Sequence, residues 1–338
     1  MPDKGNIITD FEYRRLLKEL NRIYGQAAEE LRKKLEDFNR KWAMKDAQKR
    51  ALRDAGQISE AEYREWVSHQ VFTSELWQEK ADEAARMLSR ANAEAAALVH
   101  QGRLTAFAAN ANYTLYRLEH GAAVNTGFTL YSRESVSRLV KNSPQLLPEW
   151  KIDQPKDYIW NYNRVKNSIT QGIIQGKPIP EITKDMVSQL QTGNEAKMRN
   201  FARTGMTGAQ NAGRMDMLHR QQSLGIRVRK KWVATKDSRT RDAHADLDGQ
   251  IRDVDEPFEA ENRDGSTAYI DYPGDPAAPA EQVYNCRCTM TYVYPDLDDP
   301  AFQALDHDPE APQLSYEDWL ERNENREAVQ HTSNPYRR

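Results

Sequence analysis

The two cysteines of this chain and one of its histidines are the residues best suited to chemistry. Cys286 and Cys288 are separated by a single residue, and His244 lies upstream of them among aspartates and arginines. One imidazole and two thiolates are donors that Zn²⁺ prefers, and Asp237 or one of two later aspartates could supply a fourth. These residue types predict a candidate zinc site, and a bound metal would help to order a segment rich in loops.

A simpler interpretation needs no metal. Cys286 and Cys288 would point to the same face of a strand and be buried there, as free cysteines usually are, while His244 would bond to a backbone carbonyl. Structural zinc sites usually place two or more residues between paired cysteines, which favours this alternative. A disulfide across one residue would be strained, so a reducing compartment is expected in either case.

Arginines and aspartates alternate through the same segment. We expect ion pairs that hold its loops together, formed between Arg239, Arg241 and Arg287 on one side and Asp237, Asp242 and Asp248 on the other. Such networks often imitate active sites, so a structural role is preferred to catalysis. The catalytic alternative is a zinc-dependent hydrolase or nuclease, with a water bound at His244, Cys286 and Cys288 and with Asp237 as base.

A basic stretch precedes the histidine and suggests a third hypothesis, contact with DNA phosphates. Alternation along a strand would place Arg227, Arg229 and Lys231 on one face. The ordinary explanation of such a face is that solvent covers it. DNA binding is therefore a secondary possibility.

Two strands are predicted around these residues. Residues 226–234 alternate between apolar and basic types, and residues 289–294 are rich in Thr, Tyr and Val. The segment between them contains many glycines and prolines and should be mostly loop. A loop-rich insert between two paired strands is a common place for a site.

The rest of the sequence is mainly helical in pattern. Apolar residues recur at three- and four-residue steps over residues 9–38, from Ser59, over 74–98 and over 104–118, with an interruption expected at Gly102. Further helices are expected over 158–174, 180–190 and 195–223, the last after a turn at Gly193 and Asn194. The stripes favour an intramolecular bundle, and coiled-coil assembly is the alternative.

The fold class predicted is mainly α, with an elongated helical N-terminal region and a small α+β domain near the C-terminus. A length of 338 residues exceeds a single core. We expect a helical N-terminal region (1–122), a helical middle region (123–194), the α+β domain (195–295) and an acidic tail (296–338). The tail should be disordered past Asn323.

Composition excludes some classes of protein. The formal net charge is −3, which is unlike that of a histone-like polyanion binder. The start of the chain has no signal-peptide pattern, and no run of about 18 apolar residues occurs. Cytosol-like conditions are therefore expected.

The residues of the loop-rich segment together resemble the phage Mu F family of minor head proteins. The pattern of that family runs Trp, Asp, Thr-Arg, His, Leu-x-Gly, Phe, Pro and Cys-Arg-Cys. The matching residues here include Trp232, Asp237, Thr240, Arg241, His244, Gly249, Phe258 and Arg287 between the two cysteines. The resemblance is specific from Ile169 to Tyr294.

This resemblance implies a non-enzymatic component of a tailed-phage virion, made in the cytoplasm of a bacterial host. Its partners would be the portal protein and the major capsid or scaffold protein, with viral DNA as a further partner during packaging or ejection, and no membrane. The N-terminal helices would be the attachment element. Some relatives carry a toxin domain after the conserved segment, but the chain continues only to residue 338, so none is expected.

Overall fold

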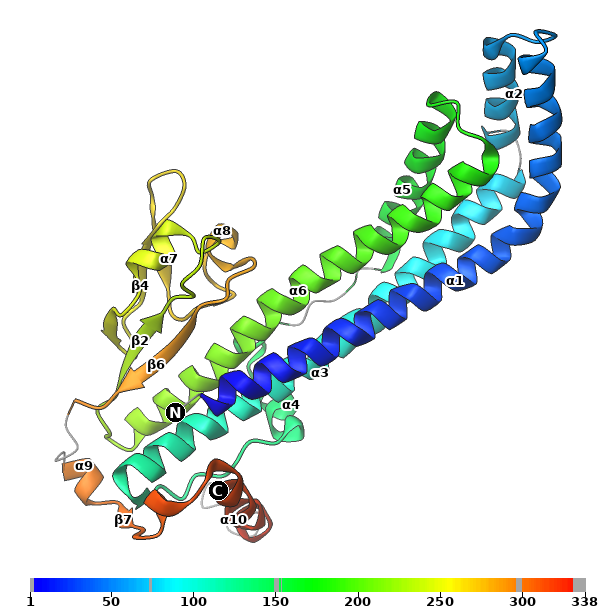
Figure 1. The fold of residues 1–338 in the computed structure, drawn as a ribbon. Coiled ribbons are helices and arrows are strands. Elements are labelled where there is room, and N and C mark those ends of the chain that lie inside the picture. Colours follow the sequence, from blue (N-terminus) through cyan, green and yellow to red (C-terminus); the bar gives the residue numbers. More distant parts are fainter. Residues whose placement is uncertain (1–2, 73–74, 149–151, 153, 296–299, 331–338) are drawn as a thin grey trace. The chain divides into compact units, whose positions relative to one another are not determined.

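The computed structural model describes residues 3–72, 75–148, 152, 154–295 and 300–330. Helices predominate and the strands are few and short, as the sequence predicts (Figure 1). The helices are α1 (Lys4–Asp54), α2 (Glu60–Phe72), α3 (Glu75–Ala122), α4 (Arg133–Asn142), α5 (Gln154–Ile174), α6 (Ile179–Ser223), α7 (Asp242–Asp246), α8 (Ala280–Val283), α9 (Pro300–Gln303) and α10 (Tyr316–Gln330). The strands are β1 (Val124–Asn125), β2 (Arg229–Val233), β3 (Ile251–Asp253), β4 (Phe258–Glu261), β5 (Thr267–Ile270), β6 (Thr289–Val293) and β7 (Asp306–His307).

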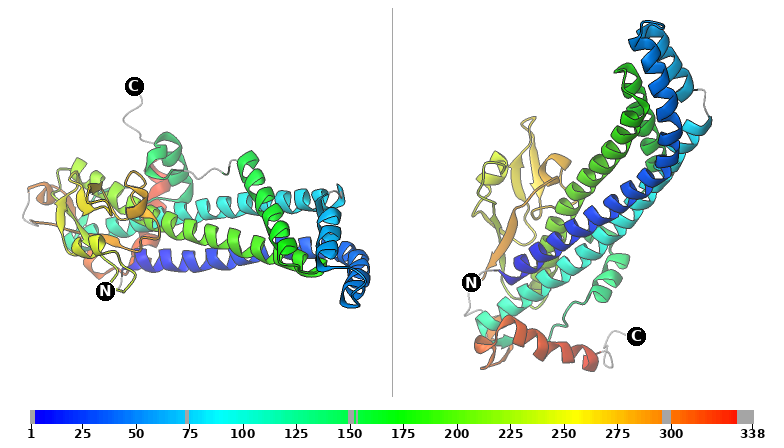
Figure 2. Two further views of the ribbon diagram at one scale, coloured as in Figure 1. Left: turned by 90° about the horizontal axis from the view of Figure 1, so that it is seen from above. Right: turned by 45° about the vertical axis from the view of Figure 1, so that its right-hand side comes forward.

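The chain forms two compact units, and the three long helices contribute to both. One unit, here called the helical unit, comprises Leu17–Leu98 and Trp150–Arg199. The other, here called the mixed unit, comprises Met1–Leu16, Val99–Glu149 and Asn200–Arg338. Within each unit α1, α3 and α6 lie side by side (Figure 2). In the described residues, no helix has a stretch long and apolar enough to cross a membrane.

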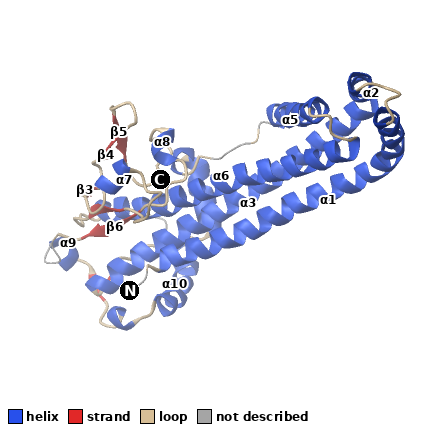
Figure 3. Cartoon of the chain, turned by 45° about the horizontal axis from the view of Figure 1, so that its top comes forward, coloured by secondary structure: helices blue, strands red, loops and turns tan. Residues whose placement is uncertain are grey.

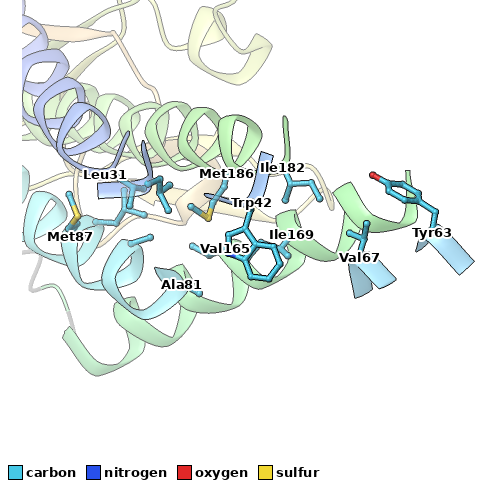
Figure 4. Close-up of a cluster of buried hydrophobic side chains, with 13 residues drawn as sticks. Leu31, Trp42, Tyr63, Val67, Ala81, Met87, Val165, Ile169, Ile182 and Met186 are labelled. Carbon is cyan, nitrogen blue, oxygen red and sulfur yellow. The ribbon is translucent and has the colours of Figure 1, made fainter. Parts of the chain in front are cut away.

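The core of the helical unit is built from apolar residues spaced one helical turn apart. Five helices each bury an i, i+4 pair in one cluster: Leu31 and Leu35, Tyr63 and Val67, Ala84 and Leu88, Val165 and Ile169, and Ile182 and Met186. Figure 4 shows part of this cluster, with Trp42 near Val165, Ile169 and Met186. Residues four apart share one face of a helix, so these pairs turn amphipathic helices into an intramolecular bundle, as predicted.

Two breaks expected from glycine are wrong. Helix α3 runs unbroken through Gly102. Glycine is needed there because an added Cβ would lie 2.7 Å from Cδ1 of Leu16. Helix α6 runs through Gly193, where the guanidinium of Arg164 occupies the space of a side chain. Its neighbour Asn194 is buried and accepts a hydrogen bond from Nδ2 of Asn92 at 3.1 Å. Close packing, not chain reversal, explains these residues.

The helix predicted to begin at Thr9 begins instead at Lys4. Thr9 lies inside it and donates its hydroxyl to the carbonyl of Gly5 at 2.9 Å, so it does not cap the helix. Ser59 and Glu62 form a capping box at the start of α2. The hydroxyl of Ser59 accepts from the amide of Glu62 at 3.1 Å, and the Glu62 carboxylate accepts from the amide of Ser59 at 2.7 Å.

The acidic C-terminal segment is more ordered than predicted. It forms α9, β7 and α10, and α10 continues to Gln330. The prediction of disorder directly after Asn323 is therefore wrong. Residues 331–338 lie outside the described residues. Trp319 anchors α10: it is buried and donates Nε1–H to Glu119 on α3 at 2.9 Å. Aromatic contacts with Tyr116 add to this packing.

The two strands predicted around the loop-rich insert are paired. β2 lies between β3 and β6 in an antiparallel sheet, with Trp232 opposite Met290. The insert also contains the β4–β5 hairpin, which the sequence analysis missed (Figure 3). Along β2 burial alternates, so Lys230 and Trp232 point into the interior.

Candidate metal centre

Trp232 is the centre of the core that supports the site. Its ring is fully buried and makes edge contacts with His244 on α7 and with Phe258 on β4, at centroid distances of 5.2 Å in both cases. Both cysteines belong to the same cluster of buried side chains. The histidine and the cysteines are therefore placed by an apolar core and not by a surface loop.

The structure brings three of the four predicted donors together. Nδ1 of His244 lies 3.5 Å from Sγ of Cys286 and 3.6 Å from Sγ of Cys288. The three donor atoms lie within 4.8 Å of one another, and the relative exposure of each residue is 3% or less. Both cysteines are free thiols. This cluster, called the Cys₂His cluster below, is the chemically most distinctive site in the described part of the chain.

The other ring nitrogen of the histidine has a partner that the sequence analysis missed. Oε1 of Gln282, on α8, lies 3.0 Å from Nε2 of His244. Nε2 of this glutamine donates to the carbonyl of Glu261 and to Oδ1 of Asn262, each at 3.0 Å. Gln282 is 4% exposed, so its amide is fixed on both sides. No motif singles it out among the glutamines of the chain.

Helix α6 holds the segment that contains the cysteines. Thr207 donates its hydroxyl to the carbonyl of Cys286 at 2.9 Å, and Nδ2 of Asn211 lies 3.4 Å from the carbonyl of Cys288. Oδ1 of Asn211 accepts from the amide of Met290 at 3.1 Å, and Arg214 donates to the Met290 carbonyl. The three helical residues recur at one-turn spacing, so one polar stripe of α6 satisfies the backbone of residues 286–290. The sequence analysis did not identify this stripe.

Asp237 is not part of the Cys₂His cluster. Its carboxylate accepts from both terminal nitrogens of Arg287, with Nη2 at 2.7 Å from Oδ1, and from the amide of Arg239 at 2.9 Å. These hydrogen bonds, that of Arg287 first, lower the pKa of Asp237 well below its usual value. The ion pair predicted for Arg287 is thus present, and the proposed fourth ligand has a different partner.

The other motif residues shape the loops around the cluster. Thr240 donates its hydroxyl to the carbonyl of Thr235, and Arg241 donates to the carbonyl of Tyr284. Gly249 has φ +80° and donates its amide to the carbonyl of Trp232 at 3.0 Å, a conformation that favours glycine. Asp248 was predicted to pair with an arginine, but it contacts Lys236 at 3.0 Å.

The basic residues proposed for DNA contact lie on and before β2, as expected. Arg229 is paired with Asp253 of the neighbouring strand, its Nε 2.6 Å from Oδ1. Arg227 is exposed and Lys231 is half-buried. Part of the positive charge of this face is therefore offset within the protein, and DNA contact stays a prediction.

The two thiols differ in their electrostatic surroundings. The pKa of the Cys288 thiol is lowered, first by a hydrogen bond from Cys286 and then by His244, against the opposing effect of burial. The pKa of the Cys286 thiol is raised, by its hydrogen bond to Cys288 and by burial. The pair therefore shares its protons unequally, with negative charge favoured on Cys288.

Comparison with known proteins assigns this part of the chain. Residues 163–291 match the family described as Phage Mu protein F like protein, a range that contains the whole Cys₂His cluster and the polar stripe of α6. Over this range the chain is similar to the phage Mu protein F-like family. This confirms the resemblance inferred from the motif residues.

Individual relatives cover only part of this chain and of themselves. The minor head protein GP7 of Bacillus phage SPP1 is 32% identical over 174 residues, which is 50% of this chain and 52% of that protein. A protein of Enterococcus faecalis named as an NAD(+)–arginine ADP-ribosyltransferase is 30% identical over 159 residues, 46% of this chain and 30% of that protein. The chain therefore spans about half or less of the length of these relatives. No solved structure matches it.

Proposed function

We propose that this protein is a minor head protein of a tailed bacteriophage that acts by binding other head proteins. Its partners would be the portal protein and the major capsid or scaffold protein, and its place would be the procapsid and then the virion. The observation that carries the proposal is the family match over residues 163–291, together with the similarity to a protein named as a minor head protein. Contact with DNA during packaging or ejection is a further part of the proposal.

The burial of the Cys₂His cluster favours binding over catalysis. A catalytic metal needs an open coordination position that a substrate can reach, whereas His244, Cys286 and Cys288 are all almost completely buried. The aspartate suggested as base, Asp237, is paired with Arg287 and lies outside the cluster. The hydrolase alternative consequently has no specific observation in its favour.

The helical unit is the part that we assign to attachment. Met44 on α1 and Ile174 on α5 are large apolar side chains that are 68% and 59% exposed. Exposed apolar side chains of this kind can bury their apolar area against a helix or a groove of a partner protein. The mixed unit would then be a second module with the Cys₂His cluster in its core.

A complementation experiment tests this proposal. A phage with a disrupted copy of the gene is supplied with the Met44→Asp/Ile174→Asp protein, and the chain is quantified in purified heads by immunoblot. We expect incorporation to fall at least tenfold, because two charges replace exposed apolar contacts. The matched control is Tyr269→Asp, at a side chain 61% exposed in the mixed unit, which should incorporate normally.

Two results would count against the proposal. Absence of the unchanged protein from purified heads would refute a role as a head component. Normal incorporation of the double variant would refute attachment through Met44 and Ile174. Separately, nuclease activity that is lost in His244→Ala would restore the hydrolase alternative.

A further inference from the structure

The His244 ring is oriented so that a lone pair faces both cysteines. Gln282 can present only its carbonyl oxygen to the ring, because its Nε2 already donates to Glu261 and Asn262. The ring therefore carries a proton on Nε2, so the neutral imidazole directs the Nδ1 lone pair toward both sulfurs. A metal-binding histidine typically donates its second nitrogen to an oxygen in this way.

The distances fit a tetrahedral ion. Zinc lies about 2.3 Å from thiolate sulfur and about 2.0–2.1 Å from imidazole nitrogen, so a tetrahedral angle separates the two donors by about 3.6 Å. The separations found here are 3.5 Å and 3.6 Å, one for each sulfur. An ion among the three atoms would bind the imidazole nitrogen and both sulfurs at once.

Charge and backbone geometry favour the same assignment. Two thiolates and one Zn²⁺ form a neutral group, which lowers the cost of placing ionised sulfurs in an apolar core. The backbone carbonyls of both cysteines accept hydrogen bonds from Thr207 and Asn211 of α6, so the backbone at the site is fixed without the metal. The residue before them, Asn285, has φ +57°, a conformation that asparagine tolerates better than most residues.

We propose that Sγ of Cys286, Sγ of Cys288 and Nδ1 of His244 bind one zinc ion, with Gln282 as the positioning residue that fixes the histidine tautomer. The ion holds α7, α8 and the start of β6 together. Among the described residues no fourth His, Cys, Asp or Glu donor joins the cluster. The role is structural because the three ligating residues are almost completely buried.

The test uses the full-length protein, expressed with zinc in the medium. Elemental analysis should give one zinc per chain, and replacement by Co²⁺ should give the visible spectrum of a tetrahedral ion with thiolate ligands. Asp237→Asn is the matched control, which should keep one zinc because its carboxylate lies outside the cluster. If the folded protein contains no zinc and gives no such cobalt spectrum, the proposal is wrong. If it contains copper or iron in place of zinc, the choice of metal is wrong.

A second measurement avoids variants that may fail to fold. In the unchanged protein, a thiol reagent should react with neither cysteine until a strong chelator is added, and then with both. His244→Ala should bind zinc at least a hundredfold more weakly, with thiols that react without a chelator. If the chelator leaves thiol reactivity in the native protein unchanged, burial alone protects the sulfurs and the zinc proposal is wrong.

Discussion

The carboxylate of Asp237 accepts hydrogen bonds from both terminal nitrogens of Arg287, the residue between the two cysteines. This pair joins the loop that follows β2 to the segment that precedes β6, fifty positions later in the chain. Two parallel N–H···O bonds restrict both position and orientation. The aspartate of the family motif is thus explained by a contact to the motif's own arginine, without a role at the metal.

Asp237→Asn should therefore loosen the loop without loss of metal. The amide cannot accept two charge-assisted hydrogen bonds from the guanidinium, so trypsin should cut after the exposed Arg239 several times faster than in the unchanged protein. Asp264→Asn is the control, because Asp264 contacts only Ser266 in its own turn. Equal cleavage rates for the two variants would contradict the role assigned to the ion pair.

The same pair predicts a pH dependence. The pKa of Asp237 is lowered in the folded protein, so its contribution is fully present above the ordinary aspartate pKa and is lost as pH falls through the lowered value. Hydrogen exchange of the Arg239 amide, which donates to this carboxylate at 2.9 Å, should accelerate relative to its intrinsic rate over that acidic range. Because the carboxylate is exposed, the effect should be local and weakened by salt.

Gln282→Leu should weaken zinc binding while all three ligands remain. Without the acceptor at Nε2 the histidine ring can rotate or change tautomer, and loss of such a partner typically costs about 10- to 100-fold in metal affinity. Competition with a coloured chelator would measure the change. Gln250→Leu is the control, since Gln250 bonds to the carbonyl of Asp246 and not to the histidine. An unchanged affinity in Gln282→Leu would show that Gln282 does not position the ring.

Much of the fold could be predicted because its signals are local. The three- and four-residue spacing of apolar residues predicted the long helices, and the alternation in residues 226–234 predicted β2 and its burial pattern. Residue types alone also pointed to the histidine and the cysteines. These patterns depend on which face of an element is buried, and a single sequence contains that information.

The missed features depend on distant partners. Gly102 and Gly193 were interpreted as breaks because glycine is a poor helix former, yet each is required by a side chain from another helix, Leu16 and Arg164 respectively. Gln282 could be identified as a site residue only from the structure, in which its Oε1 on α8 lies 3.0 Å from Nε2 of His244 on α7. The strands β3, β4 and β5 have three or four residues each, too few for a clear alternation.

Lys230→Met should stabilise the mixed unit. Lys230 is fully buried on β2. Its Nζ has no hydrogen-bond partner among the residues that the structure describes, and it lies 5.4 Å from the ring centroid of Phe258. Burial lowers its pKa to about 8, although Asp271 and Asp255 oppose the shift. Relative to an ordinary lysine this corresponds to a cost of about 3 kcal/mol at pH 7. An apolar side chain of similar length would remove most of it.

The pH dependence distinguishes this cost from a change in packing. The unfolded chain keeps the Lys230 proton up to its ordinary pKa, so the stability of the unchanged protein should rise between pH 8 and about 10.5 from this group. The free energy gap between Lys230→Met and the unchanged protein, measured by urea unfolding, should therefore narrow from pH 7 to pH 10. A gap that is the same at both pH values would contradict the assignment to charge burial.

Gly213→Ala should destabilise the mixed unit, because α6 and α3 approach each other there without room for a side chain. An added Cβ would lie 2.3 Å from the backbone oxygen of Phe107, and neither helix can yield by rotating a side chain. We expect a loss of about 3 kcal/mol, in the upper range for overpacking. Gly121→Ala, on α3 in the same unit, is the control: nothing lies within 4 Å of its added Cβ, so the substitution should be neutral or stabilise by up to about 1 kcal/mol. Differential scanning calorimetry would compare the two, and equal melting temperatures would show that the close approach of α6 to Phe107 does not limit the packing.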